Sequence, residues 1–368
     1  MLFQNNMKKL QFYFVLPSAF TTFVIMKKQS DRTASFRMPA EWEHQRAVML
    51  TWPHEGTDWR PYLDDIQSTC VKMVEAIARF EDVIIAAEHP DEVRALLSHI
   101  DEDRVAIYPV TNDDTWARDH GPITLIDSES SERLLLDFRF NGWGNKFSAD
   151  NDNLLTRRLF DEGAFEGEII DNNDFVLEGG SIETDGQGTL FTTAQCLLAP
   201  NRNQPLSQME IEGELKRRLN MERIVWLHHG NPIGDDTDGH IDTTVRLAPN
   251  DTLLYVSCTP DDEQYDDFRL LEDELKSLRT ADRRRYRLLS LPSPKPIYFD
   301  GERLPATYAN FLVVNGAVIV PTYNQPDSDS EAMRVIGEAF PDREIVGIDA
   351  TVIIRQHGSI HCMTMQIY

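Results

Sequence analysis

The stretch "NFLVVNGAVIVPTY" (310–323), followed by "DSEAMRVIGEAF" (329–340), contains the structural unit that decides the fold. Two apolar runs flank Asn315-Gly316, a dipeptide typical of the tight turn between two antiparallel strands. The second stretch spaces its apolar residues as one face of a helix does. The pair therefore predicts a β-hairpin followed by a helix.

The same order recurs along the chain. Hairpins are predicted in "SIETDGQGTLFTT" (181–193), around Asp185-Gly186, and in "VRLAPNDTLLYVS" (245–257), with its turn at 249–251. Helical spacing is present over 63–80, 91–100, 152–160, 207–219 and 262–279. The later helices begin near 152, 207, 262 and 329, a recurrence of about sixty residues. No long linker divides the chain after residue 38, so we predict one α/β domain of repeated units over 38–368.

Residues 1–37 differ from the rest of the chain. "MKKLQFYFVLPSAFTTFVIMKK" (7–28) has a basic start and an apolar run that Gln11, Pro17 and Thr21 interrupt, too short for a spanning helix. No clear small-x-small cleavage site follows, so a signal peptide and a start upstream of the true one both stay open. We expect 1–37 to form an N-terminal extension outside the fold.

The composition excludes some functions. Lys plus Arg number 36 against 61 Asp plus Glu, a formal charge of −25. This balance argues against nucleic-acid binding and favours the attraction of a cationic small molecule. The four cysteines Cys70, Cys196, Cys258 and Cys362 form no CxxC pair, so they predict neither a structural zinc site nor a disulfide scaffold. Free thiols suit a reducing compartment, and we expect a cytoplasmic protein, with export left open by the N-terminus.

Polar residues follow the same period as the hairpins. Asp119 lies in "DDTWARDHGP", Glu178 in "FVLEGGS", His240 in "DDTDGHIDTTVR" and Cys362 in "GSIHCMT". Their separations are 59, 62 and 122, the last being twice 61. In a radially repeated fold, equivalent loops of successive units meet around one axis. The spacing predicts that two carboxylates, an imidazole and a thiol converge.

Each of these residues alone has a plain structural interpretation. Asp119 precedes a Gly-Pro turn and could accept a local hydrogen bond, Glu178 could be a solvated strand end, and His240 could be a satisfied structural histidine. Together they indicate a reaction. A thiol with a histidine is ordinary nucleophilic chemistry, while carboxylates around it disfavour an oxyanion and match a guanidinium. We therefore expect Asp119 and Asp242 to hold a guanidinium whose central carbon Cys362 attacks.

Several longer motifs resemble those of agmatine deiminases and bacterial peptidylarginine deiminases, members of the guanidine-modifying superfamily. The resemblance runs from about residue 38 to 368, through "MPAEWEHQRAVMLTWP" (38–53), "DDTWARDHGP", "FNGWGNKF", "LEGGSIETDGQGTLFTTAQCLLAPNRN" (177–203), "DDTDGHID", "FPDREIVGID" and "GSIHCMTMQ". It implies a five-bladed α/β propeller of ββαβ units, the pentein fold. It also implies a hydrolase acting on linear amidines, converting agmatine to N-carbamoylputrescine and ammonia in putrescine and polyamine biosynthesis, without metal or organic cofactor.

The resemblance also implies roles for individual residues. Cys362 would be the nucleophile, His240 the general acid that later activates water, and Asp119 and Asp242 the guanidinium-binding carboxylates. Glu178 would pair with His240 or the substrate.

Other positions would bind the rest of the substrate. Trp116 would cover its aliphatic stem, the acidic run with Asp236 and Asp238 would meet a distal amine, and Arg118 is placed among the substrate-binding residues. The expected partner is a small cationic guanidine, with no nucleic acid or membrane, and a homo-oligomer stays open.

One motif departs from the family pattern. The better-known agmatine deiminases end with GGGNIHC, whereas this chain has "RQHGSIHC", with Gln356, His357, Gly358 and Ser359 ahead of the shared IHC. The added bulk could fit the pocket to a related guanidine. Four alternatives stay open: a peptidylarginine deiminase acting on protein arginine, an amidinotransferase in which a second amine replaces water, a non-catalytic guanidine binder, and a cysteine protease, against which the carboxylates count.

Overall fold

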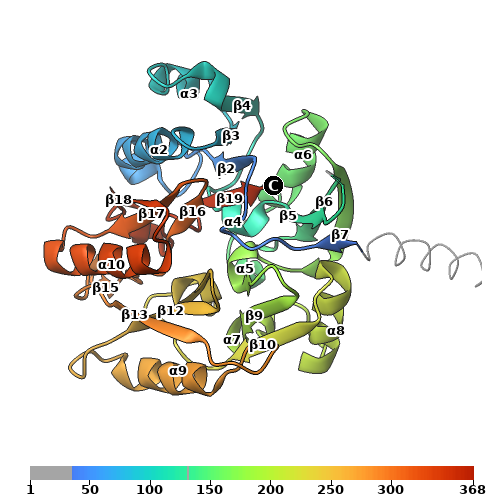
Figure 1. Ribbon diagram of the computed structural model, residues 1–368. Coiled ribbons are helices and arrows are strands. Elements are labelled where there is room, and N and C mark those ends of the chain that lie inside the picture. Colours follow the sequence, from blue (N-terminus) through green and yellow to red (C-terminus); the bar gives the residue numbers. More distant parts are fainter. Residues whose placement is uncertain (1–34, 131) are drawn as a thin grey trace, which may run out of the picture. The chain divides into compact units, whose positions relative to one another are not determined.

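The computed structural model describes residues 35–130 and 132–368, and the compact unit runs from Phe36 to Tyr368 (Figure 1). Most of the predicted extension over 1–37 lies outside the described residues. Its last two residues form β1 (Phe36–Arg37), which pairs antiparallel with β5 just ahead of the predicted boundary at residue 38. Within the described ranges, no helix is long and apolar enough to cross a membrane.

Four hairpin–helix–strand units follow one another in the chain. They are β5 (Ile123–Asp127), β6 (Arg133–Arg139), α6 (Leu155–Asp161) and β7 (Glu168–Val176); β8 (Ile182–Thr184), β9 (Thr189–Thr193), α8 (Gln208–Leu219) and β10 (Arg223–Leu227); β11 (Val245–Ala248), β12 (Thr252–Ser257), α9 (Tyr265–Ser277) and β13 (Arg287–Pro292); and β16 (Leu312–Val314), β17 (Ala317–Thr322), α10 (Pro326–Ala339) and β18 (Glu344–Asp349). In each unit the first two strands pair antiparallel, and the helix leads to a third strand parallel to the second.

A further sheet joins the two ends of the compact unit. Strand β19 (Thr364–Ile367) pairs antiparallel with β2 (Ala47–Thr51), and β3 (Asp82–Ala87) and β4 (Val105–Pro109) continue it in parallel. Helix α2 (Leu63–Ala78) connects β2 to β3, and α3 (Pro90–Leu96) connects β3 to β4. The residues just ahead of β19, including Cys362, are therefore anchored in a sheet and do not lie in a loose tail.

The three predicted hairpins are confirmed. Their turns contain residues with positive φ, the conformation that these short connections need: Gly186 at 72°, Asn250 at 61° and Gly316 at 91°. The predicted helices are confirmed as α2, α3, α6, α8, α9 and α10, although the segment predicted over 152–160 begins with a 3-10 turn, η3 (Asp152–Leu154).

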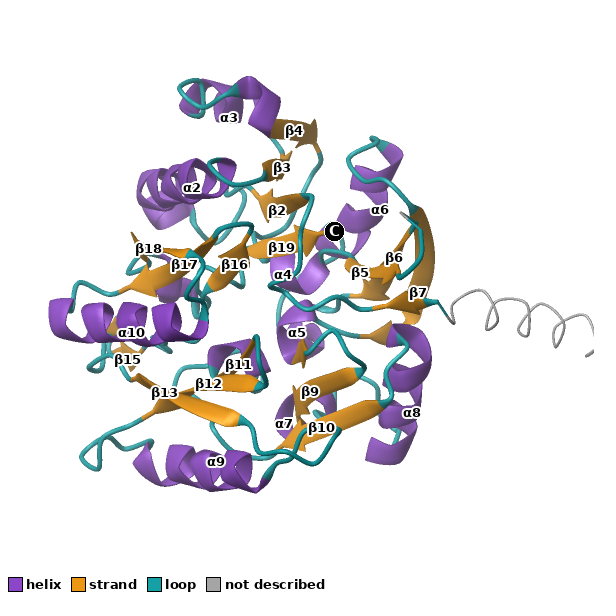
Figure 2. Ribbon diagram, viewed as in Figure 1, coloured by secondary structure: helices purple, strands orange, loops and turns teal. Residues whose placement is uncertain are grey.

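Helix α8 shows why these helices lie where they do. Ser207 and Glu210 form a reciprocal capping box at its start, and Asn220 in the left-handed conformation ends it. Its fully buried Ile211, Leu215 and Leu219 stand four residues apart, on one face. Figure 2 shows α8, α9, α10 and α2 on the outer side of the sheets, so the beginnings of the hairpins face inward.

Short elements complete the described fold. They are α4 (Ala117–His120), α5 (Gly142–Asn145), α7 (Ala194–Leu197), the ribbon β14 (Tyr298–Phe299) and β15 (Glu302–Arg303), and the 3-10 turns η1 (Arg60–Tyr62), η2 (Glu102–Arg104), η4 (Gly179–Ser181), η5 (Ile241–Thr243) and η6 (Ile353–Gln356). Three of them precede hairpins: α4 precedes β5, η4 precedes β8 and η5 precedes β11. Asp119, Glu178 and His240 lie in or beside these three elements.

Candidate active site

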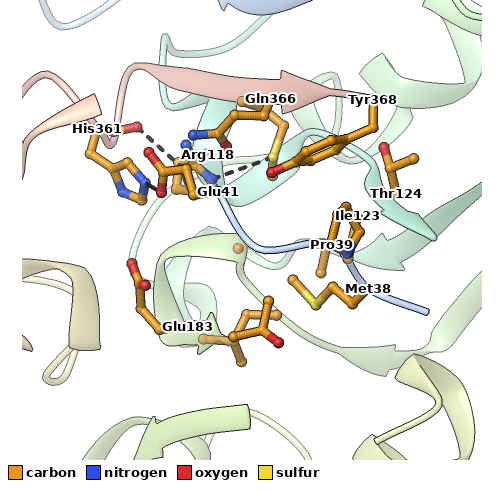
Figure 3. Close-up of a pocket in the computed structure, with 14 residues that line it drawn as sticks. Met38, Pro39, Glu41, Arg118, Ile123, Thr124, Glu183, His361, Gln366 and Tyr368 are labelled. Atoms are coloured by element: carbon orange, nitrogen blue, oxygen red, sulfur yellow. Dashed lines mark hydrogen bonds and ion pairs between the residues drawn. The ribbon is translucent and has the colours of Figure 1, made fainter. Parts of the chain in front are cut away.

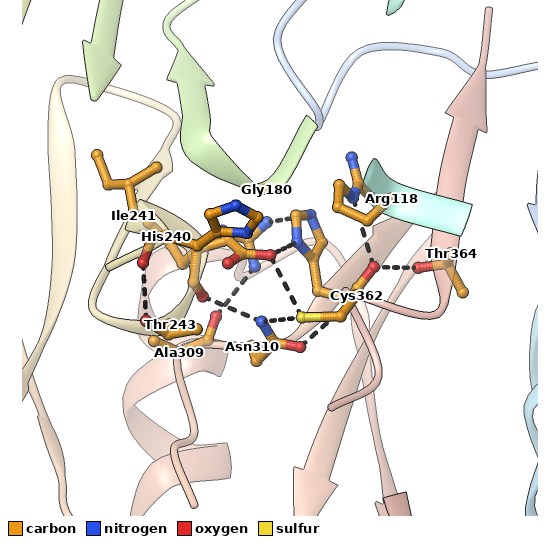
Figure 4. A network of polar contacts seen from close by, with 12 residues as sticks. Arg118, Gly180, His240, Ile241, Thr243, Ala309, Asn310, Cys362 and Thr364 are labelled. Atoms are coloured by element: carbon orange, nitrogen blue, oxygen red, sulfur yellow. Dashed lines mark hydrogen bonds and ion pairs between the residues drawn. The ribbon is translucent and has the colours of Figure 1, made fainter. Parts of the chain in front are cut away.

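The segments ahead of the hairpins meet through hydrogen bonds. The Gly180 amide of η4 donates to Oδ1 of Asp119 in α4 (3.1 Å). Nδ2 of Asn310, just ahead of β16, donates to the Asp242 carbonyl of η5 (3.4 Å) and to Sγ of Cys362 (3.2 Å). Figure 4 shows this network around Cys362. The predicted convergence of carboxylates, imidazole and thiol is therefore present in the structure.

Cys362 is held by contacts at both its backbone and its side chain. Asn310 accepts a hydrogen bond from the Cys362 amide through Oδ1 (3.2 Å) while its Nδ2 approaches the sulfur. Oδ2 of Asp242 lies 3.7 Å from Sγ. Burial, and then the charges of Asp242 and Asp119, raise the pKa of the Cys362 thiol well above its usual 9.0. In the protein without a ligand, the sulfur therefore keeps its proton at neutral pH.

Asp242 is fully buried, and only one of its two carboxylate oxygens accepts a hydrogen bond from the described residues. Nδ1 of His361 donates to its Oδ2 (2.7 Å), while Oδ1 accepts no hydrogen bond from the described residues. Burial acts to raise the pKa of Asp242, but the hydrogen bond from His361 and nearby positive charges lower it below its usual value. An ionised, buried oxygen without a donor is costly, so this atom is suited to a ligand that brings an N–H group.

Asp119 carries the second carboxylate of the site. Trp143 donates from Nε1 to its Oδ2 (2.9 Å), which fixes the carboxylate plane together with the Gly180 amide. Burial raises the pKa of Asp119, the carboxylates of Asp242 and Glu178 act in the same direction, and His240 opposes them. A bound cation would relieve this concentration of negative charge.

His240 stands between two carboxylates and is fully buried. Its Nδ1 lies 3.6 Å from Oδ1 of Asp119, and its Nε2 lies 3.9 Å from Oε2 of Glu178. Burial alone would lower the pKa of His240, but Asp119 and then Cys196 and Glu178 raise it well above 6.5. Glu178 is itself held by Nε of Arg202 at 2.8 Å. The two carboxylates therefore favour the imidazolium form of His240, which can give up a proton.

Gly180 must be a glycine for this geometry to exist. A Cβ at this position would lie 2.6 Å from Nδ1 of His240, 3.0 Å from Oδ1 of Asp119 and 3.2 Å from Oδ2 of Asp242. The Gly179-Gly180 pair thus allows the close approach that its place beside Glu178 predicts.

A cavity of about 250 Å³ leads to the thiol. Cys362 and Asp119 lie at its buried end, and the aromatic side chains of its walls are Tyr62, Trp116, Trp143 and Phe147. Trp116 is fixed by a hydrogen bond from its Nε1 to Asp114 (2.9 Å), and its ring packs so closely on Gly358 that a Cβ there would lie 2.1 Å from it. Trp116 therefore lies where the predicted substrate stem would pass.

The acidic run has two different roles. Asp236 lines the cavity that Cys362 also lines, and its contact with a distal amine stays a prediction. Asp238 does not: its carboxylate pairs with Arg202 (2.6 Å) and Lys146 (2.8 Å), which ties the loop ahead of η5 to neighbouring segments. The structure thus brings Asp236 to the site and places Asp238 in an ion-pair network behind it.

Arg118 lies away from the cavity that Cys362 lines. Its side chain borders a smaller cavity of about 50 Å³, together with Glu41 (Figure 3). Its Nε donates to the His361 carbonyl (3.4 Å), and its backbone amide donates to the Cys362 carbonyl (3.1 Å). Arg118 therefore supports the backbone of His361 and Cys362, and the structure does not bring its side chain together with the other predicted residues.

Sequence reasoning missed Asn310, Trp143, His361 and Arg202. The spacing of about sixty residues leaves one empty place between His240 and Cys362, and Asn310 stands near it, just ahead of a predicted hairpin. Trp143 and Arg202 lie in motifs that carry the family resemblance, so they could have been singled out there. His361 precedes the nucleophile, and nothing in the pattern assigns it to Asp242.

Among the described residues, two side-chain clusters have donor atoms close enough for a metal ion: the buried Glu178, Cys196 and His240, and the partly buried Glu41 with the buried Glu183 and His361. In both, an arginine already neutralises the carboxylates. Arg202 pairs with Glu178, and Arg246 binds both Glu41 and Glu183. A guanidinium so close to the ligand atoms repels a metal cation, so these clusters are ion-pair networks.

A buried thiol, a histidine and two carboxylates, carried on segments that precede different sheets of a repeated α/β fold, are the arrangement expected of enzymes that modify guanidines. A model of the Porphyromonas-type peptidyl-arginine deiminase family matches residues 37–367, and the chain belongs to this family.

Known relatives span nearly the whole chain. It is 35% identical to the agmatine deiminase of Pseudomonas aeruginosa (strain LESB58), over 91% of this chain and 96% of that protein. Among solved structures, a variant of agmatine deiminase from C. jejuni with substrate bound has a TM-score of 0.83 at 36% identity, covering 90% of this chain and 96% of that one. The putative arginine deiminase of Porphyromonas gingivalis has a TM-score of 0.84 at 46% identity, covering 90% and 98%.

Proposed function

We propose that this protein hydrolyses agmatine to N-carbamoylputrescine and ammonia through a covalent intermediate on Cys362. One observation carries the proposal. Asp242, whose Oδ2 lies beside the thiol, has a second buried carboxylate oxygen that accepts no hydrogen bond from the described residues, and Asp119 lines the cavity that leads to the thiol. A guanidinium supplies the N–H donors and the positive charge that this arrangement lacks.

Binding of the cation prepares the nucleophile. The two carboxylates that raise the pKa of the Cys362 thiol are those that the guanidinium would neutralise. Its charge would therefore lower the thiol pKa when the substrate is in place. On substrate binding the thiol would release its proton to solvent and form a thiolate next to the substrate, whereas without substrate it would stay an unreactive thiol.

In the first half of the reaction, the sulfur of Cys362 attacks the central guanidinium carbon and forms a C–S bond. His240 gives its proton to one amino group, the C–N bond breaks, and ammonia leaves. The product on the enzyme is an S-alkylthiouronium. Asp119, 3.6 Å from His240, and Glu178, 3.9 Å from it, stabilise the imidazolium that begins this step.

In the second half, His240 removes a proton from water, and the oxygen attacks the same carbon. The C–S bond then breaks, the electron pair returns to the sulfur, and the ureido product leaves. His240 thus acts first as an acid and then as a base, which its position between two carboxylates supports.

The description of the family supports a second candidate, deimination of arginine in a peptide. The same buried end of the cavity would serve it, and the difference would lie in the mouth. Amidino transfer to a second amine would use the same intermediate, with the amine in place of water.

Two further points belong to the proposal. Among the sheets of the described residues, five have an antiparallel pair of strands and a third strand parallel to one member of that pair, which supports a five-bladed propeller over the domain 38–368. The thiols of Cys70, Cys196, Cys258 and Cys362 are unpaired, which suits the cytoplasm.

The test measures ammonia release from agmatine, free arginine and a blocked arginine peptide, with Cys362→Ala as the control. Turnover of agmatine that disappears in Cys362→Ala supports the proposal, and N-carbamoylputrescine should accumulate. Turnover of the peptide alone would favour the second candidate. Unchanged turnover in Cys362→Ala would rule out the mechanism.

A further inference from the structure

The mouth of the cavity contains a cation that the reaction at Cys362 does not use. Arg355 lines the same cavity as Cys362, and its side chain is 31% exposed. Its guanidinium carbon lies 5.3 Å from the ring centre of Tyr62 and 5.1 Å from that of Phe299. The two rings restrict the arginine to one region of the mouth, so its charge is already positioned before a ligand arrives.

The pairing of Arg355 is loose. Nη1 lies 3.9 Å from Oδ2 of Asp65, whose side chain is 68% exposed. An ion pair of this length between partly exposed groups is weak. The Arg355 guanidinium therefore keeps N–H donors that can bind both oxygens of a carboxylate, the bidentate geometry that arginine favours.

The charges of the cavity change from its buried end to its mouth. Asp119 and Cys362, 4% and 3% exposed, form the end that suits a guanidinium. The more exposed part of the lining carries charges of both signs, because it includes Arg355 as well as the carboxylates of Asp58 and Asp236. A substrate whose guanidinium reaches Cys362 would place its other end near these positive and negative side chains at the mouth.

We propose that Arg355 binds a carboxylate at the distal end of the substrate, so that the enzyme also accepts ω-guanidino acids, including the amino acid arginine. This inference rests on the proposed deimination at Cys362 and extends it beyond agmatine. A carboxylate gains a charged hydrogen bond from Arg355, and an α-ammonium on the same substrate can turn to Asp236. The distal ammonium of agmatine gains only the second contact and is repelled by Arg355.

The test compares kcat/KM for 4-guanidinobutyrate, arginine and agmatine in the native protein and in Arg355→Met. Methionine keeps an unbranched side chain against Tyr62 and Phe299 but removes the charge. We expect kcat/KM for 4-guanidinobutyrate to fall by about 10- to 100-fold, the range of a lost hydrogen bond to a charged group, while that for agmatine stays within about 3-fold or rises. Arg355→Lys, which keeps the charge without the fork, should lose less than Arg355→Met.

Arg269→Met is the matched control, because Arg269 pairs with Asp273 on the exposed side of α9. It should leave all three substrates unchanged. Equal losses for agmatine and 4-guanidinobutyrate in both Arg355 variants would show a structural role and overturn the inference, as would a native protein that hydrolyses agmatine and neither acid. A native protein that hydrolyses no guanidine would instead overturn the proposed function.

Discussion

The buried end of the cavity and its mouth are built in different ways. At the buried end, Asp119 and Asp242 are 4% and 0% exposed, and each is fixed by a neighbouring donor, Trp143 or His361. At the mouth, Asp236 and Arg355 are partly exposed and have weaker constraints. Charges in a water-poor site act strongly and tolerate little change, whereas exposed charges are screened. The reaction should therefore depend on the buried end, and substrate choice on the mouth.

Among substitutions that keep Cys362, the largest effect should come from Asp242→Asn. The amide keeps an acceptor for His361 but removes the negative charge beside the guanidinium, and it can turn N–H donors toward the cation. We expect kcat/KM for agmatine to fall by about 10³-fold, the upper end of the range found for groups that stabilise developing charge in a closed site. Ammonia release measures the loss, and an unchanged melting temperature would show that folding is intact. A loss below about 10-fold would contradict the role given to this carboxylate.

A smaller but still large effect should come from Gly180→Ala. The new methyl group would press on His240 at 2.6 Å and on the carboxylates of Asp119 and Asp242, so all three must shift. A displacement of about 1 Å at a reacting group can reduce turnover by about 10²-fold, and we expect kcat to fall by that amount.

Gly213→Ala provides the matched control for this substitution. Gly213 lies inside α8, and a Cβ there meets nothing within 4 Å. Alanine should stabilise the helix by about 0.5–1 kcal/mol and leave kcat unchanged. If both alanine variants lost activity equally, the crowding at Gly180 would not be the cause.

The thiol itself allows a third test of the buried end. Its pKa is raised by burial and by the charges of Asp242 and Asp119, so the reactive thiolate forms only at high pH in the ligand-free protein. Alkylation of Cys362 by iodoacetamide should therefore keep rising beyond about pH 9, past the ordinary thiol range. Asp119→Asn removes one cause of the shift and should increase the rate several-fold at a fixed lower pH.

Mass spectrometry of the alkylated peptides would follow each cysteine separately. Cys258, which is only partly buried, serves as the internal reference, because Asp119→Asn should not change its rate. A Cys362 rate that levels off near neutral pH would contradict the raised pKa.

The sequence was sufficient to predict the repeating part of the fold. Turns such as Asn315-Gly316 need left-handed backbone, and helices such as α9 carry a regular apolar face, so both are local properties. The convergence of Asp119 and His240 was also predictable, because the repeat spacing implies equivalent loops.

Contacts between repeats could not be predicted in this way. The pairing of His361 with Asp242 joins residues 119 positions apart, and Asn310 reaches Cys362 across 52. The side chains of Arg118 and Asp119, neighbours in α4, point in different directions. Asp119 points into the site, whereas Arg118 points away from the cavity, and the backbone direction of α4 determines this difference. A one-dimensional spacing places a residue in a loop and leaves the direction of its side chain undetermined.

The smallest effect should come from His357→Gly, at the mouth. His357 has a φ of 65°, a left-handed conformation that glycine adopts without strain, so the substitution relieves backbone strain of about 1 kcal/mol. It also removes the contact between Nδ1 of His357 and the Gly234 carbonyl at 2.7 Å. Because these effects oppose each other and Cys362 lies deeper, we expect kcat to be unchanged and KM for agmatine to move by less than about 5-fold, under 1 kcal/mol. A loss of kcat near that of Gly180→Ala would show that the residues ahead of the nucleophile belong with the buried end, and the division between reaction and substrate choice would have to be redrawn at His357.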